Sequence, residues 1–364
     1  MRKLLFILGS CIALSVSAQQ RYLGGDISLL PSYEEAGAVY RDAGGEPVEV
    51  LTFLKQQGWN AMRVRLFVNP EYAPQKHKEE GVCQDLDYTI RLSKRIQQAG
   101  FVLLLDIQYS DYWADPSKQT IPRLWDDAPA ESLPDSVYQY TKRTLLAFQK
   151  AGVVPELIQV GNEITYGMLW SVGKVNPLKD DNWDMLCCLL SQGSKACREI
   201  CPKAKIVIHT ERAGDWDVTH SYYKHLRERA LDYDIIGLSY YPMWHKSVRN
   251  LGMTLRKLAK CFPDKEVMIV ETAAYYSHEH DIWAKSPDQY AEFYPISTEG
   301  QTQFACELVE ELHWHANVTG LFWWFPEENA CQNDLLPCWL NRGLFDNHTG
   351  KVKPAMKVFS EFLQ

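Results

Sequence analysis

Short apolar runs alternate with amphipathic segments along most of this chain. The runs are rich in β-branched and aromatic residues, and the segments between them repeat their apolar residues at helical spacing. This alternation predicts a parallel sheet with a helix after each strand. The expected strands are 23–28, 61–67, 101–107, 158–164, 205–209, 235–239, 266–271 and 320–324. The expected helices are 48–57, 86–98, 136–151, 182–200, 218–230, 247–260, 298–314 and 354–363.

These strand–helix units fit a closed barrel better than an open sheet. An open, doubly wound sheet usually carries a glycine-rich phosphate loop after its first strand. Here Gly24 and Gly25 lie at the start of that strand and lack the dinucleotide-binding pattern. We see no low-complexity linker, charge run or abrupt change of composition along the chain. We therefore predict an α/β fold, a (β/α)8 TIM barrel in a single domain over residues 19–364.

The first residues have the pattern of an export signal. A positively charged start precedes an apolar stretch over 4–16, and small residues at 15–18 offer a cleavage site. The stretch is too short to span a bilayer comfortably, and no other segment is apolar enough to cross one. We predict a signal peptide over 1–18 and an exported protein that is secreted, periplasmic or on the cell surface. Because LGSC (8–11) resembles a bacterial lipobox, a lipid anchor on Cys11 is the alternative.

Charge and cysteine content narrow the class of partner. The net charge of −8 and the pI of about 5.7 argue against nucleic acid, because phosphate binding needs a basic surface. Of the 10 cysteines, Cys11 lies in the signal, so the mature chain keeps an odd number and at least one free thiol. Cys331 and Cys338 flank a loop-like stretch and are the best candidates for a disulfide. No cysteine spacing fits a zinc site.

Two expected strands end in a glutamate, Glu163 and Glu271. In a closed barrel the carboxyl ends of all strands meet on one face, so the two side chains can meet. Glycoside hydrolysis needs such a pair, with one carboxyl protonated to help the leaving oxygen and the other ionised to attack the anomeric carbon. Burial and the negative charge of one carboxylate raise the pKa of the other carboxyl group. The alternative, that each glutamate only pairs with Arg63 or Arg65, explains one strand-end acid more easily than two with Asn162 beside the first.

Sequence blocks around these residues resemble a known family. The blocks are GGDIS (24–28), RVRLFVNP (63–70), YSDYWADPSKQ (109–119), VGNEI (160–164), LSYYPMWH (238–245), ETAAYY (271–276) and GLFWW (320–324). They are similar to glycoside hydrolase family 53, the endo-β-1,4-galactanases, and they span nearly all of the chain after the signal. Asn162-Glu163 with Glu271 resembles the larger clan of retaining glycosidases on (β/α)8 barrels, whose acid/base follows an asparagine on strand four and whose nucleophile lies on strand seven.

This resemblance implies an arabinogalactan endo-β-1,4-galactanase. It would cleave β-1,4-galactan, as in the type I arabinogalactan side chains of pectin, to galacto-oligosaccharides by double displacement. Glu163 resembles the general acid/base and Glu271 the nucleophile. Asn162 resembles the residue that binds the sugar 2-OH, where contacts strengthen in the transition state. Arg63 stands where the clan keeps an arginine that would help to hold Glu271 ionised.

Aromatic residues complete the expected substrate site. Tyr240 or Tyr241 would hold the nucleophile in place, and their spacing does not choose between them. The candidates for the cleft floor, where aromatic faces stack on sugar rings, are Asp111, Trp113, Trp244, Trp323 and Trp324. For each tryptophan, ordinary core packing is the alternative.

The chain departs from the family pattern at two places in the expected cleft wall. Gln108 stands where the family usually has a histidine before YSD, and TERA (210–213) follows His209 where the family tends to have Asp-Asn-Gly. Both departures bear on subsite preference more than on the reaction. The resemblance implies no required cofactor. Some bacterial members hold calcium in the loop after strand seven, but SHEHDIW (277–283) offers few oxygen ligands, so we predict no metal site and keep calcium as an alternative.

Two other functions stay open at this point. One is another β-glycanase of the clan, acting on mannan, xylan or glucan. The other is a non-catalytic surface protein that binds glycans, against which the presence of both Glu163 and Glu271 argues. The expected partner in either case is a polysaccharide. We expect a monomer, because a cleft for an extended polymer works well on one.

Overall fold

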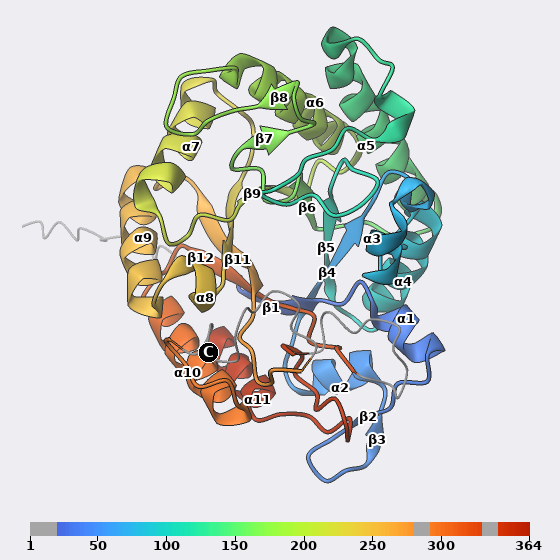
Figure 1. Cartoon of the computed structure of the whole chain (residues 1–364), viewed down its shortest axis with the longest axis vertical. Helices are drawn as coiled ribbons and strands as arrows, with labels where there is room; N and C mark the ends of the chain where they lie inside the picture. The colour runs from blue at the N-terminus through green and yellow to red at the C-terminus, as the bar shows by residue number, and fades with distance from the viewer. Residues whose placement is uncertain (1–19, 280–291, 330–340) are drawn as a thin grey trace, which may run out of the picture.

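The computed structural model describes residues 20–279, 292–329 and 341–364, and a closed barrel of parallel strands forms its centre (Figure 1). This confirms the predicted (β/α)8 fold. The strands are β1 (Tyr22–Asp26), β4 (Ala61–Leu66), β5 (Val102–Ile107), β6 (Leu157–Val160), β9 (Lys205–Thr210), β10 (Ile235–Tyr240), β11 (Glu266–Thr272) and β12 (Val318–Trp324). The barrel closes because β1 pairs with β4 on one side and with β12 on the other.

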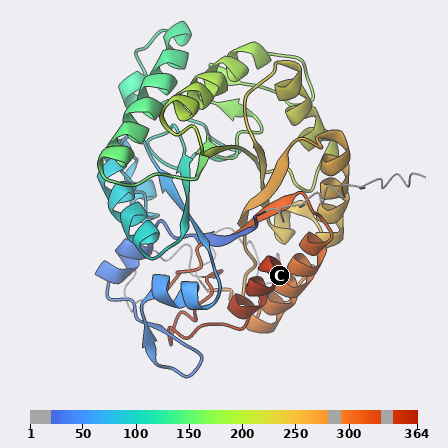
Figure 2. The ribbon, with the colours of Figure 1, turned by 180° about the vertical axis from the view of Figure 1, so that it is seen from behind.

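Helices surround the barrel, as Figure 1 and the reverse view in Figure 2 both show. The main helices are α2 (Val50–Gln56), α4 (Leu86–Gln98), α5 (Leu133–Lys150), α6 (Trp183–Ile200), α7 (Trp216–Glu228), α9 (Val248–Cys261), α10 (Thr298–His313) and α11 (Ala355–Phe359). Side chains cap several of them: Asp85 accepts from the Tyr88 amide at the start of α4. The buried side chains of α4 recur every three or four residues, so this helix turns one face to the barrel.

Short elements are inserted in the connections that follow the strands. The short helices are α1 (Leu30–Glu35), α3 (Gln75–Glu79) and α8 (Pro242–His245), and the 3₁₀ turns are η1 (Pro70–Tyr72), η2 (Arg123–Trp125), η3 (Ala130–Ser132) and η5 (Ser360–Leu363). Two small hairpins pair β2 (Tyr40–Arg41) with β3 (Pro47–Val48) and β7 (Gly167–Met168) with β8 (Gly173–Lys174). All but η5 lie in strand-to-helix connections, and these connections build the carboxyl-end face of a barrel.

Side chains inside the barrel change from apolar to polar along the strands. An apolar cluster fills the inner part, and on four of the strands the next residue on the same face, two positions on, is polar. The pairs are Ala61 and Arg63 on β4, Leu104 and Asp106 on β5, Leu157 and Gln159 on β6, and Val207 and His209 on β9. The polar layer therefore lies towards the carboxyl ends of the strands, on top of an apolar plug.

Strand boundaries agree with the predicted ones to within a few residues, with one exception. We expected 158–164 as a strand ending near Glu163, but β6 ends at Val160, so that prediction is wrong. Gly161 has φ +84°, a left-handed conformation that glycine adopts without steric cost, and it turns the chain out of the sheet. Glu163 then lies in the loop, with φ +48°.

Several sequence predictions fall on residues outside the described ranges. They are the signal segment with Cys11, the Cys331–Cys338 disulfide and most of the SHEHDIW segment, so each stays a prediction. The division into a signal peptide over 1–18 and one domain over 19–364 likewise stays a prediction. Within the described ranges, no helix combines the length and the apolar character that crossing a bilayer requires.

Candidate active site

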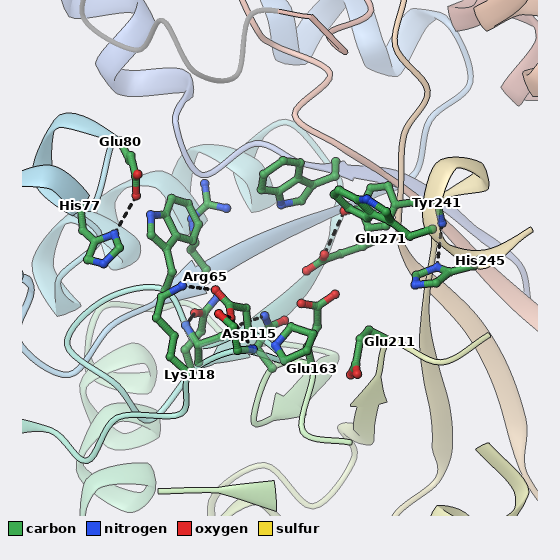
Figure 3. A pocket seen from close by; sticks show the side chains of 18 of the residues that line it. Arg65, His77, Glu80, Asp115, Lys118, Glu163, Glu211, Tyr241, His245 and Glu271 are labelled. Atoms are coloured by element: carbon green, nitrogen blue, oxygen red, sulfur yellow. Dashed lines mark hydrogen bonds and ion pairs between the residues drawn. The ribbon is translucent and has the colours of Figure 1, made fainter. Parts of the chain in front are cut away.

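A cavity of about 910 Å³ opens at the carboxyl ends of the barrel strands. The connections after β4, β5, β6, β9, β10 and β12 build its wall, together with the end of β11. Figure 3 shows Glu163 and Glu271 facing each other across the cavity, with Glu211 beside Glu163. The cavity thus lies on the barrel face where enzymes of this fold carry their chemistry.

The two glutamates lie close enough to act on one bond. A carboxyl oxygen of Glu163 and one of Glu271 are within 4.8 Å of each other. Retaining glycosidases keep their carboxyl groups about 5–5.5 Å apart, whereas inverting enzymes need about 6.5–9.5 Å to admit a water molecule. The separation here therefore suits direct attack by one carboxylate on the sugar and leaves little room for a water between them.

Glu271 is held by a cation and a phenol. Arg63 contacts its Oε1 at 2.9 Å, and the Tyr241 hydroxyl donates to its Oε2 at 3.0 Å. Burial raises the pKa of Glu271, and the Arg63 guanidinium is the main influence that lowers it again. A donated hydrogen bond and a positive charge both favour the carboxylate form. Glu271 is therefore the glutamate of the pair that the site is built to keep ionised.

Glu163 has the opposite environment. Burial raises its pKa well above the ordinary value, and the negative charges of Glu271 and Glu211 raise it further. The Ser239 hydroxyl, 2.7 Å from Oε1, opposes this rise, and we find no ion pair to Glu163 within the described part of the chain. Of the two adjacent carboxyl groups, Glu163 is therefore the one whose surroundings favour the protonated form.

Arg63 joins the site to the barrel interior. Its guanidinium contacts Asp26 at 2.6 Å and Asp106 at 2.9 Å besides Glu271, and it is fully buried. Burial raises the pKa of Asp106 to about 7, so this cluster carries less negative charge than its carboxyl groups suggest. A buried arginine needs such carboxylate partners, because an unpaired charge is costly to remove from water. Because a buried ion cluster is costly to break on one side, these partners also fix where the guanidinium lies.

Asn162 is oriented on both sides of its amide. Its Oδ1 accepts from Arg63 at 2.8 Å, and its Nδ2 donates to the Ala114 carbonyl at 2.8 Å. The Gln119 side chain donates to the Asn162 carbonyl at 2.8 Å and so holds the loop after β6. The amide therefore faces the cavity in one fixed orientation, which a group that reads a sugar hydroxyl requires.

Comparison with known proteins decides the family. The sequence profile of glycosyl hydrolase family 53 matches residues 22–359. The chain belongs to glycosyl hydrolase family 53. It is 32% identical over 371 residues to a probable arabinogalactan endo-β-1,4-galactanase A of Neosartorya fischeri, a match that covers 98% of this chain and 97% of that one. It is also 32% identical over 314 residues to an endo-β-1,4-galactanase of Bacillus subtilis, covering 83% of this chain and 69% of that one.

Solved structures agree with this membership of family 53. A family 53 catalytic domain of Ignisphaera aggregans superposes with a TM-score of 0.84 at 28% identity, covering 96% of this chain and 98% of that one. A fungal β-1,4-galactanase gives a TM-score of 0.77 at 28% identity, covering 93% of this chain and 98% of that one. A xylanase of Cellvibrio japonicus shares only the fold, at 14% identity and a TM-score of 0.58.

The structure chooses between the two tyrosines that the family 53 pattern left open. Tyr241 donates its hydroxyl to Glu271. Tyr240 points away from the cavity, donates to the Lys246 carbonyl at 2.8 Å and packs on Phe304. Adjacent residues at a strand end point to opposite sides, so only one of the two tyrosines could reach Glu271.

The expected tryptophans also divide. Trp113, Trp244 and Trp324 line the cavity. Trp244 is the most exposed of them, with 51% of its surface accessible, and it packs edge-on against Tyr241. Trp323 does not line the cavity, because its side chain is buried in the core and its Nε1 donates to the Arg342 carbonyl. For Trp323 the alternative of core packing describes its position.

Asp111 and Gln108 shape the cavity wall in different ways. Asp111 does not line the cavity; its buried carboxylate accepts from the backbone amides of Asn69 and Arg123 and ties two connections together. Gln108, which replaces the usual family 53 histidine, donates to Asp106 at 3.0 Å and accepts from the Ala114 amide at 3.0 Å. Gln108 therefore braces the loop that carries Ala114 and the wall residue Trp113.

Three residues that contact or adjoin the glutamates were not predicted as site residues: Ser239, Gln119 and Glu211. Ser239 bonds Glu163, and Glu211 lies in the wall and accepts from Thr165 at 2.7 Å. The alternation of side chains along β10 could have revealed Ser239, because this residue is two positions before Tyr241 and so faces the same side. His209, noted only as a point of departure, also belongs to the site.

The cluster of Glu163, His209 and Glu271 has the composition of a metal site but not its chemistry. One potential ligand atom of each lies within 4.8 Å of the others. However, Nδ1 of His209 is next to the Glu163 amide and Nε2 is 2.9 Å from Ser239, so both ring nitrogens already have partners. The guanidinium on Glu271 further opposes a cation there.

Proposed function

We propose that this protein is an exported, retaining endo-β-1,4-galactanase in which Glu163 is the general acid/base and Glu271 the nucleophile. The observation that carries the proposal is the glutamate pair itself. The carboxyl oxygens lie within 4.8 Å, and the pair is unequal because Glu271 contacts Arg63 while Glu163 contacts the Ser239 hydroxyl. That separation and that inequality are what double displacement requires.

In the first half of the reaction, Glu163 gives its proton to the leaving glycosidic oxygen while a Glu271 oxygen attacks the anomeric carbon. The C–O bond to the departing chain breaks and a covalent glycosyl–enzyme ester forms. Arg63 and Tyr241 hold the Glu271 carboxylate in position for attack. Asn162 offers its amide to the sugar 2-OH, where the contact strengthens in the transition state.

In the second half, Glu163 is ionised and removes a proton from water, which attacks the anomeric carbon and releases Glu271. Once Glu271 is esterified it carries no negative charge, so the largest of the charge effects that raised the pKa of Glu163 is gone. Glu163 then becomes a carboxylate more readily, as a general base must. The same residue therefore serves as acid and then as base because its neighbour's charge changes.

The substrate rests on the relatives and on the wall of the cavity. Proteins named arabinogalactan endo-β-1,4-galactanase or endo-β-1,4-galactanase align with 83% or more of this chain. Trp113, Trp244 and Trp324 line the cavity and supply flat faces for pyranose rings. The xylanases share only the fold with this chain, so they lend no support to a xylan substrate. We therefore place β-1,4-galactan, as found on pectin, ahead of mannan, xylan and glucan.

Export and a monomeric state belong to the same proposal. The export signal over 1–18 fits an enzyme whose polymeric substrate cannot enter a cell, and an anchor on Cys11 would keep it at the surface. A polymer reaches the cavity of a single chain, so no second copy is needed.

Product analysis tests the proposed reaction and substrate together. The purified protein is incubated with galactan, mannan, xylan and β-glucan, and the products are resolved by chromatography. We expect a series of galacto-oligosaccharides from galactan and no soluble products from the other polymers. Proton NMR of the first products should show the β-anomer before mutarotation. Release of single galactose residues alone, or α-anomers first, would contradict an endo-acting, retaining enzyme.

Tyr241→Phe should weaken the nucleophile without removing it. The lost hydroxyl donates to the Glu271 carboxylate, and a hydrogen bond to a charged group is worth about 1.5–3 kcal/mol. We expect kcat/KM on galactan to fall roughly 10- to 100-fold. The pKa of Glu271 should rise, so the acidic limb of kcat/KM should move to higher pH. Tyr240→Phe is the matched control and should leave that limb in place, because among the described residues this hydroxyl bonds the Lys246 carbonyl alone.

A further inference from the structure

Ser239 connects the two glutamates. Its Oγ lies 2.7 Å from Glu163 Oε1 and 3.5 Å from Glu271 Oε2. A third partner, His209 Nε2, is 2.9 Å away. Ser239 and His209 are fully buried at the ends of β10 and β9. One hydroxyl hydrogen therefore has two carboxyl groups within range.

Three groups surround His209 Nδ1, and two of them are donors. The Glu163 amide donates at 3.3 Å and the Gln159 side-chain Nε2 lies at 3.1 Å. The third, Asn162 Oδ1 at 2.9 Å, is an acceptor that already receives hydrogen bonds from Arg63 and Gln159. The two donors favour a lone pair on Nδ1, which places the imidazole hydrogen on Nε2. Burial, with the Arg63 charge nearby, lowers the pKa of His209 well below its ordinary value and keeps the ring neutral. Nε2–H then donates to Ser239 Oγ, so the serine hydrogen points elsewhere.

The bonding capacity of Ser239 matches both states of the pair. A hydroxyl accepts two hydrogen bonds and donates one. When Glu163 is protonated, Oγ accepts from Glu163 and from His209, and its own hydrogen is directed to the Glu271 carboxylate. When Glu271 is esterified and Glu163 is ionised, a rotation about the C–O bond directs the same hydrogen to Glu163. His209 donates to Oγ in both states and needs no change of tautomer.

We propose that Ser239, oriented by His209, is a positioning residue whose single hydroxyl hydrogen follows the negative charge between Glu271 and Glu163 during the two half-reactions. The inference rests on the proposed function, because it needs the two glutamates to exchange charge. No net proton is gained or lost by the serine. The shorter contact, to Glu163, makes the second half-reaction the one that depends more strongly on it.

Other charged and titratable groups surround Glu163 and Glu271, and they also influence the pH dependence of the reaction. Those around Glu163 and Glu271 are Arg63 and Arg65 on β4, Asp26 on β1, Asp115 after β5, His209 and Glu211 at the end of β9, and Tyr241 after β10. Of these, only His209 hydrogen-bonds Ser239 among the described residues. Removing the serine hydroxyl therefore leaves the other contacts of the glutamates in place.

The test compares Ser239→Ala with wild type on a nitrophenyl β-galactobioside, for which hydrolysis of the glycosyl–enzyme limits kcat. The ionised Glu163 loses the hydrogen-bond donor on Ser239, so we expect kcat to fall about tenfold. The acidic limb of the pH profile of kcat should move up by about one pH unit. KM should fall with kcat as the intermediate accumulates. Ser239→Thr, which keeps a hydroxyl, should return the limb towards its wild-type position. Thr272→Val is the matched control and should leave the limb where it is. It removes a buried hydroxyl that, in the part of the chain that the structure describes, bonds the Tyr240 carbonyl alone.

Three results would each overturn the inference. A Ser239→Ala protein whose pH profile coincides with that of wild type, or whose two half-reactions slow equally, would leave the serine a structural role only. Nitrogen-15 NMR of the ring of His209 is independent of activity and should show Nε2 protonated from acidic to alkaline pH; an Nδ1–H tautomer would also overturn it. If wild type cleaves no glycoside, the proposed function fails, and the NMR result still decides the orientation of Ser239.

Discussion

Glu271→Ala should abolish turnover of galactan, with kcat reduced by at least about 10⁴-fold, the order seen when an essential nucleophile is removed. Without the carboxylate, no ester can form, and the remaining groups can only bind and orient the sugar. Adding azide should restore some turnover of a nitrophenyl β-galactoside, because the small anion fits where the carboxylate stood. Direct attack from that side inverts the anomeric carbon, so the product should be the α-galactosyl azide.

The matched control for this variant is Glu266→Gln. Glu266 starts the same strand at the opposite end of the barrel, where it contacts Lys205 and Thr319 and not the cavity. We expect this protein to keep activity within about twofold, since surface and rim ion pairs are worth about 1 kcal/mol or less. Circular dichroism should show that both variants are folded. A folded Glu271→Ala protein that cleaves galactan at the wild-type rate would refute the assignment of the nucleophile.

Much of this architecture follows from patterns along the chain. The alternation of β-rich runs with helical segments is repeated through the barrel, and each repeat supports the same topology. Strand ends were the places to look for acids, and Glu271 lies in β11 where expected. The small hairpins and short helices were not predicted, because stretches of two to six residues show no periodicity. Their positions depend on contacts with the finished barrel.

The alternation of side chains between the two faces of a strand explains which of the neighbouring tryptophans and tyrosines reach the cavity. Trp324 faces the cavity and Trp323 the core because neighbours on β12 point to opposite sides, and the same rule separates Tyr241 from Tyr240. A strict count along each strand could have made these choices. It could not have placed Glu163, because Gly161 takes the chain out of the sheet before that residue. The backbone of Glu163 is fixed instead by contacts from other strands, such as His209 on β9.

The two glutamates differ in their tendency to ionise because different residues lie close to them in the folded structure. Glu163 and Glu271 are the same amino acid, and only their neighbours differ. Arg63 reaches Glu271 from β4, whereas Glu211 adds a second negative charge beside Glu163. These contacts join residues far apart in the chain, so the resemblance to family 53 could suggest the roles while the folded structure supplies their physical cause.

Glu163→Ala should affect substrates according to their leaving group. Galactan has a poor leaving group that needs a proton, so kcat/KM on galactan should fall about 10²- to 10⁴-fold. A dinitrophenyl β-galactobioside leaves without protonation, so its kcat/KM should change little. Its kcat should still fall, because no general base activates water in the second half, and KM should fall with it as the glycosyl–enzyme accumulates.

The pH profile and the product formed with azide test whether Glu163 is the general acid/base. Its pKa is raised, so wild type keeps the acid protonated near neutral pH and loses activity on galactan as the pH rises through that pKa. In Glu163→Ala this basic limb of kcat/KM should disappear. Azide should speed turnover of the dinitrophenyl substrate by attacking the intermediate from the side that Glu163 occupied, which gives the β-galactosyl azide. An α-azide from this variant, or equal losses on both substrates, would reverse the assignment of the two glutamates or remove Glu163 from the reaction.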